Sequence, residues 1–175
     1  MVVKNKRSLS RLEFYNTARK LRTDLTNFLL RDFGVRNKVY KQIYDNKEVT
    51  TTEQYPQWLI DYFRRSIIAI LNNLMNNIVA ANSIYPINSD EVNYRRVIQD
   101  KAIANCEQLF QELVYLSDIL PISLIKVEPY AEVIDKEIIL LKAWRKSTNL
   151  IARRTKKKKK KLPVNALQKL TRNYL

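Results

Sequence analysis

The side chains of this sequence that are best suited to a chemical role are lysines and arginines, whose cations can neutralise phosphate groups. They are concentrated in the last quarter of the chain. From Lys142 to the end, the sequence carries lysines and arginines but not a single carboxylate. A cation that replaces a condensed counterion gains affinity for a nucleic-acid backbone. We therefore assign nucleic-acid binding to the densest part of this segment: Arg153, Arg154, Lys156, Lys157, Lys158, Lys159, Lys160 and Lys161.

Basic residues elsewhere bring the formal charge of the chain to +15. The polar start adds three cations to the nucleic-acid set: Lys4, Lys6 and Arg7. Two pairs of arginines lie in apolar-striped segments, and we assign them to partner binding: Arg64, Arg65, Arg95 and Arg96. The plainer alternatives are a solvated tail that binds any polyanion weakly, and paired cations that only face water.

Two aromatic residues, Tyr94 and Trp144, lie near these cations in the sequence. Stacking on nucleobases is one use for such rings, but both lie close to apolar stripes, and we expect them to pack inside the protein. The chain has no RNA-recognition, zinc-finger or helix-turn-helix signature. Binding is therefore expected to depend on the phosphate backbone and to read little sequence.

The residue types that most catalytic and cofactor sites need are missing. The chain has no histidine, which excludes Ser-His and Cys-His nucleophile systems and most zinc sites. Its one glycine, Gly34, excludes glycine-rich phosphate loops, and we expect it to end the first helix in a left-handed conformation. Cys106 lies on an apolar stripe and predicts a buried, unreactive thiol. We expect no enzymatic activity, no cofactor and no metal.

The distribution of apolar residues argues against a membrane protein. No apolar run reaches the roughly 18 residues of a membrane span, and no signal peptide opens the chain. We therefore expect a cytoplasmic protein. Apolar residues make up 46% of the sequence, which is enough for a substantial core.

Apolar residues recur at helical spacing in four long stretches. Ser10 and Glu13 form a capping box ahead of the first stretch, and Pro56 suits the first turn of the second. Asn88 or Ser89 is suited to cap the third. The first three expected helices cover residues 10–34, 56–82 and 88–120. The fourth is expected to begin between residues 123 and 129 and to end at about residue 151.

Two segments fall outside this helical pattern. Residues 35–55 are polar and irregular, and we expect an insertion with at most a helical turn at Lys38–Tyr44. Residues 152–175 form a basic tail, in which residues 165–175 predict a short amphipathic helix. The predicted fold is all-α: an antiparallel up-down four-helix bundle over residues 1–151, with a basic C-terminal extension.

Five short pieces of the sequence form a recognisable set between residues 4 and 150. They are Lys6-Arg7-Ser8, Leu12-Glu13-Phe14, Ala80-Ala-Asn-Ser-Ile-Tyr-Pro86, Glu91-Val-Asn-Tyr-Arg-Arg96 and Trp144-Arg-Lys-Ser147. Together they resemble the accessory variability determinant (Avd) family of diversity-generating retroelements. These four-helix-bundle proteins of bacteria, archaea and phages are similar to proteins encoded by intervening sequences of 23S ribosomal RNA genes.

The resemblance implies a small, basic, non-enzymatic protein that forms a homo-oligomer, a pentamer in better-known members. It implies binding to the reverse transcriptase of the element and to its template RNA. The basic tail lies outside the resemblance, and we assign it to RNA or to cDNA. The assembly would support mutagenic reverse transcription and retrohoming, in which the cDNA diversifies a target gene. The chain differs from the family in a longer connection at Asn37–Tyr55 and in the additional segment Thr148–Leu175.

Two alternatives of other classes remain open. One is a free-standing RNA- or ribosome-associated helical protein that needs no polymerase partner. The other is a membrane-surface or phage-structural bundle, against which the scarcity of aromatic residues in the tail argues.

Overall fold

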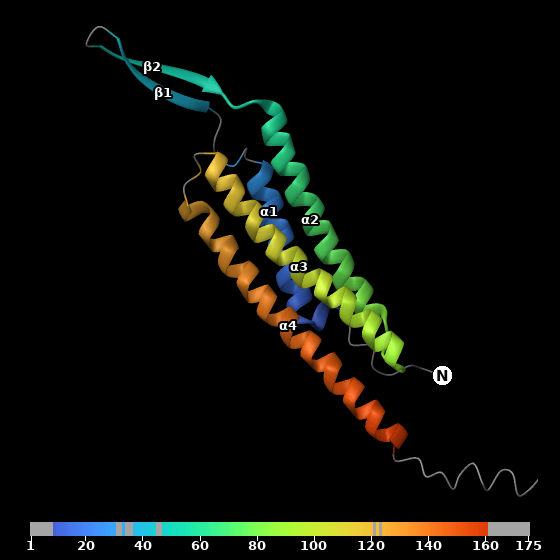
Figure 1. The fold of residues 1–175 in the computed structure, drawn as a ribbon. Coiled ribbons are helices and arrows are strands. Elements are labelled where there is room, and N and C mark those ends of the chain that lie inside the picture. Colours follow the sequence, from blue (N-terminus) through green and yellow to red (C-terminus); the bar gives the residue numbers. More distant parts are fainter. Residues whose placement is uncertain are drawn as a thin grey trace, which may run out of the picture.

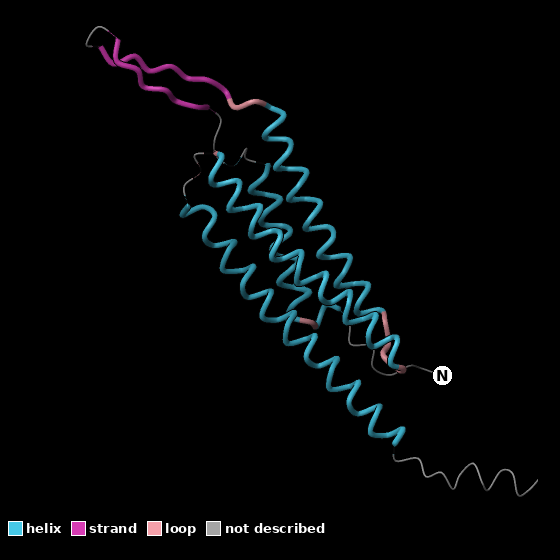
Figure 2. Tube along the Cα trace, viewed as in Figure 1, coloured by secondary structure: helices cyan, strands magenta, loops and turns pink. Residues whose placement is uncertain are grey.

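The computed structural model describes residues 9–30, 33, 37–44, 47–120, 122 and 124–160; for Ser10 and residues 37–44, 47–54 and 150–160 it describes the backbone alone. These residues form a bundle of long helices from which a β-hairpin projects (Figures 1 and 2). In chain order the elements are η1 (Leu9–Arg11), α1 (Glu13–Leu30), β1 (Asn37–Tyr44), β2 (Lys47–Gln54), α2 (Gln57–Ser83), α3 (Ser89–Ile119) and α4 (Leu124–Lys160).

Local signals in the sequence set the starts of α2 and α3. The predicted capping box of Ser10 and Glu13 was wrong, because Ser10 lies inside η1 and α1 begins at Glu13. Asn88 caps α3: its side chain accepts a hydrogen bond from the Glu91 N–H at 2.8 Å, and the Glu91 carboxylate accepts one from the Asn88 N–H at 3.2 Å. This confirms the predicted cap and satisfies two otherwise unpaired donors. Pro56 immediately precedes α2, and its carbonyl accepts from the Leu59 N–H.

The four helices pack with each one running opposite to the one before it (Figure 1). Arg64, early in α2, donates a hydrogen bond to the Leu29 carbonyl at the end of α1. Arg145, late in α4, donates one to Asp100, early in α3. Because α1 also packs on α4, the first and last helices close the bundle. The predicted four-helix bundle is therefore confirmed.

The core is made by the predicted apolar stripes. The α2 stripe is almost completely withdrawn from solvent, as is the α3 stripe up to Leu116. Ile119, the last residue of α3, is 42% exposed. Gly34 lies outside the described residues, but its neighbour Phe33 has a left-handed φ of 56° and a fully buried ring.

Two expectations about the irregular segments were wrong. The insertion at residues 35–55 contains an antiparallel hairpin rather than a helical turn, with Tyr44 opposite Lys47 and Asn37 opposite Gln54. Helix α4 does not end near Ile151 but continues to Lys160, so the first part of the basic tail belongs to the helix. The expected helix at residues 165–175 lies outside the described residues. No helix in the described part of the chain combines the length and the apolar character needed to cross a membrane.

Candidate nucleic-acid interface

The second half of α4 is the structural element that carries the predicted cations. Lys142 and Lys146 are exposed on it, and the backbone from Arg153 to Lys160 continues the same helix. Trp144 stacks on Phe14 in the first turn of α1, so the part of α4 beyond Trp144 extends past the start of that helix (Figure 1). The predicted RNA arm is thus built, over this range, on a continuous helix.

The spacing of charge along this helix suits a nucleic acid. Consecutive residues advance by about 1.5 Å, so Lys156–Lys160 place one cation per ~1.5 Å of axis. Duplex DNA carries one phosphate charge per ~1.7 Å of its own axis. Successive positions also differ by about 100° around the helix, so the five lysine positions are distributed around it. Such an arrangement attracts a phosphate backbone without defining a base-specific contact.

The structure separates the remaining predicted cations. Lys4, Lys6, Arg7 and Lys161 lie outside the described residues. Arg64 and Arg65 lie near the end of the bundle where the hairpin projects, whereas Arg95 and Arg96 lie at the opposite end, early in α3 (Figure 1). The two arginine pairs therefore do not form one surface. Arg64 is half-buried against the end of α1, and the Arg65 side chain donates to the Asp61 carbonyl at 3.3 Å.

Arg95 has a structural role. It donates a hydrogen bond to the Ile84 carbonyl at 3.0 Å, and its guanidinium lies 5.4 Å from the centre of the Trp144 ring. Burial lowers the pKa of Arg95 below its ordinary value. Arg95 thus joins the α2–α3 connection to the late part of α4. Three of the sequence pieces that carry the Avd resemblance meet at this contact, because Ile84, Arg95 and Trp144 each belong to a different piece.

The two candidate stacking residues differ in their surroundings. Trp144 packs as expected: its ring lies 4.3 Å from that of Phe14 in a stacked arrangement. Tyr94 does not, because it is 63% exposed on α3. Tyr85, in the loop before α3, was not singled out from the sequence and is 77% exposed at the same end of the bundle. These two tyrosines are therefore available for stacking on nucleobases.

Acidic residues gather at the hairpin end of the bundle. Between residues 103 and 136, covering the second half of α3 and the first half of α4, the sequence has six acidic residues and only two lysines. Exposed apolar residues of all four helices also gather there: Leu30, Trp58, Tyr62, Val114, Tyr115, Ile119, Leu124 and Ile125. The molecule thus has a basic end and an acidic, apolar end. Neither the net charge of the sequence nor its helical periodicity predicted this separation of charge.

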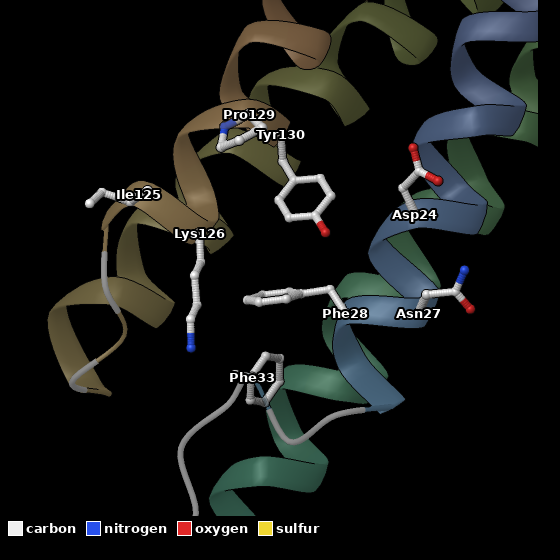
Figure 3. Close-up of a pocket in the computed structure, with 8 residues that line it drawn as sticks. All are labelled: Asp24, Asn27, Phe28, Phe33, Ile125, Lys126, Pro129 and Tyr130. Carbon is white, nitrogen blue, oxygen red and sulfur yellow. The ribbon is translucent and has the colours of Figure 1, made fainter.

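A cavity of about 610 Å³ opens between the end of α1 and the start of α4 at this acidic end. Figure 3 shows the Phe28 ring directed toward Tyr130 across the cavity, with Phe33 below and Lys126 beside it, while Ile125 points away. The Phe28 ring centre lies 5.4 Å from that of Tyr130 and 5.7 Å from that of Phe33. These ring contacts join Phe33 and the end of α1 to the start of α4.

One carboxyl group is buried in the core, and sequence reasoning missed it. Glu137 is completely buried on α4, and neither of its oxygens has a hydrogen-bond partner among the described residues. Burial, with a smaller contribution from Glu13, raises its pKa to about 8, and Lys136 opposes the shift. Burial also raises the pKa of the Cys106 thiol, with Glu137 contributing. The predicted burial of Cys106 is confirmed.

Three or more side chains of the kinds that hold metals come together nowhere in the described part of the chain. A buried hydrogen bond, which Gln99 donates to the Thr148 hydroxyl at 3.2 Å, joins α3 to α4. Its position in the core suits a role in aligning the two helices.

No family model, curated protein sequence or solved structure matches the chain. The resemblance to the Avd family therefore stays a prediction from the sequence.

Proposed function

We propose that this protein is a non-enzymatic accessory subunit of a diversity-generating retroelement. It binds the element's reverse transcriptase and its template RNA or cDNA in the cytoplasm, and it supports mutagenic reverse transcription. The observation that carries the proposal is the continuous α4 helix, whose second half bears cations and no carboxylate. The Avd resemblance supplies the identity of the partners.

The opposite end of the bundle suits a protein partner. Trp58 and Tyr62 are 67% and 47% exposed on the first turns of α2. Aromatic residues are enriched in protein interfaces because they bury large areas with little loss of conformational freedom. In this arrangement the basic end holds nucleic acid and the acidic, apolar end holds the polymerase, so the two are presented along one rigid bundle.

The outer face of α2 supports self-association. From Ser66 to Ser83 the helix has no charged residue, and Ile68 and Val79 are partly exposed on it. Copies that each carry a charge of +15 repel one another, so a contact between them is favoured where the surface is uncharged. This face is our candidate for the homo-oligomer contact, a pentamer if the chain follows the family.

Co-purification with the reverse transcriptase encoded nearest to this protein tests the proposal. We expect a stoichiometric complex at moderate salt that survives nuclease treatment. The double variant Trp58→Ala/Tyr62→Ala should lose the polymerase but keep its RNA affinity. A matched double variant at the other end, Tyr85→Ala/Tyr94→Ala, should keep the polymerase.

A complex that disappears with nuclease, or no complex at all, contradicts the accessory-subunit proposal. The free-standing RNA-binding protein is then favoured, since the basic half of α4 suffices for RNA binding without a polymerase. A complex that both double variants form equally well would leave the polymerase contact elsewhere on the bundle and refute its placement on α2.

A further inference from the structure

A second hollow lies between the end of α3 and the start of α4. It encloses about 420 Å³, within the range of binding pockets in proteins. Leu113 and Val127 form its buried floor, and Val114 and Leu124, 42% and 70% exposed, lie along its sides. We call this feature the α3–α4 groove. Partly exposed apolar side chains around a hollow are typical of a surface that accepts a partner.

Carboxylates make the α3–α4 groove selective for a basic occupant. Asp118 on α3 and Glu128 on α4 line it, and both are exposed. Neither has an ion-pair partner among the residues whose side chains the structure describes. The surrounding surface is the acidic end defined above. The whole chain has a formal net charge of +15 and repels other cations. The α3–α4 groove, by contrast, attracts a cationic, apolar segment.

The end of this chain has that chemistry. Residues 162–175 contain Leu167, Leu170 and Tyr174 at helical spacing, together with Lys169 and Arg172 and no carboxylate. An amphipathic segment of this kind binds an apolar groove through residues at such intervals. We propose that residues 162–175 of one copy occupy the α3–α4 groove of a second copy.

Chain length excludes the groove of the same copy. Val127 in the groove and Lys160 at the end of α4 are separated by about 50 Å of helix at ~1.5 Å per residue. The fifteen residues that follow Lys160 span at most about 50 Å when fully extended. Nothing would remain to lie in the groove, so the occupant comes from another copy. Contacts of this head-to-tail kind produce rings or open chains.

Fluorescence anisotropy with a labelled peptide of residues 162–175 and the full-length protein tests the proposal without polymerase or RNA. We expect saturable binding, weakened about tenfold or more by Asp118→Lys/Glu128→Lys. The matched control Glu107→Lys/Asp135→Lys changes the same charge on the same two helices outside the groove and should alter the affinity less than twofold. Circular dichroism verifies that both variants, altered only at exposed sites, keep their helices.

Three outcomes would overturn the proposal. The first is no binding of the peptide to the wild-type protein. The second is equal weakening by the groove pair and the control pair, which would mean attraction to general acidity. The third is unchanged affinity of a peptide with Leu167→Asp/Leu170→Asp, which would exclude the apolar contact. Because the assay contains no nucleic acid and no polymerase, its failure is separate from a failure of the accessory-subunit proposal.

Discussion

Glu137 is the residue whose environment conflicts most with its chemistry. Its carboxyl group is fully buried and has no hydrogen-bond partner among the described residues, which favours the neutral form. With a pKa of about 8 in the folded protein and 4.5 as the ordinary value, Glu137 keeps a proton in the folded state that the unfolded chain releases between these values. Stability should therefore fall as the pH rises from 4.5 to 8, and level off above 8.

Replacement of this carboxyl by an amide, Glu137→Gln, should remove that pH dependence. As the pH rises from 5.5 to 8.5, the wild type should lose on the order of 2–3 kcal/mol of stability that the variant keeps, at ~1.4 kcal/mol per pH unit. Urea denaturation at the two pH values measures the difference. Glu132→Gln removes an exposed carboxyl from the same helix and should leave the pH dependence unchanged. Parallel wild-type and Glu137→Gln profiles would show that Glu137 is not protonated in the folded state.

Among the elements, the β-hairpin is the least integrated with the fold. It projects from the end of the bundle in Figures 1 and 2, and a hairpin of two strands has little stability of its own. Its roots, Asn37 and Gln54, are directly opposite each other in the register. Partners in an antiparallel ladder lie about 5 Å apart, so the hairpin can be excised and its ends rejoined by a short linker.

Deletion of residues 37–54 with two glycines in their place should leave the bundle intact. We expect the free energy of unfolding to change by less than about 1 kcal/mol, since the entropy of a connecting loop depends only weakly on its length. Urea denaturation followed by circular dichroism provides the measurement. A loss of several kcal/mol would show that the hairpin packs on the helices.

The elements also show which features are readable from sequence. The helices were predictable because the core imposes a 3.6-residue period on Phe63, Ile67 and Leu74, and because Asn88 supplies a local cap. The hairpin was missed although Asp45-Asn46 and the β-branched run after Val49 are signals for one. Burial of Glu137 was missed although its position is a signal for it: Glu137 lies three residues after Ile134 and four before Leu141, on the apolar stripe of α4. Its charged residue type masked that position.

At the scale of the whole molecule, charge is divided along the bundle axis. If Lys156–Lys161 each replace one phosphate counterion, they contribute about 5 to the log–log salt slope of RNA affinity at ~0.9 per contact. Lys158→Gln/Lys159→Gln/Lys160→Gln should therefore reduce the slope by 2 to 3. Lys20→Gln/Lys101→Gln/Lys126→Gln removes three exposed lysines elsewhere and should reduce it by less. Equal slopes for the two variants would refute α4 as the RNA arm.

Closure of the bundle by α1 and α4 also has a consequence for synthesis of the protein. The ribosome makes Phe14 more than a hundred residues before its stacking partner Trp144. At ~5–20 residues per second, α1 waits roughly 6–26 s for the helix that completes its burial. During that interval α2 and α3 can pair with each other as neighbours in the chain. Until α4 has been synthesised, the apolar side of the first helix that belongs against α4 remains uncovered.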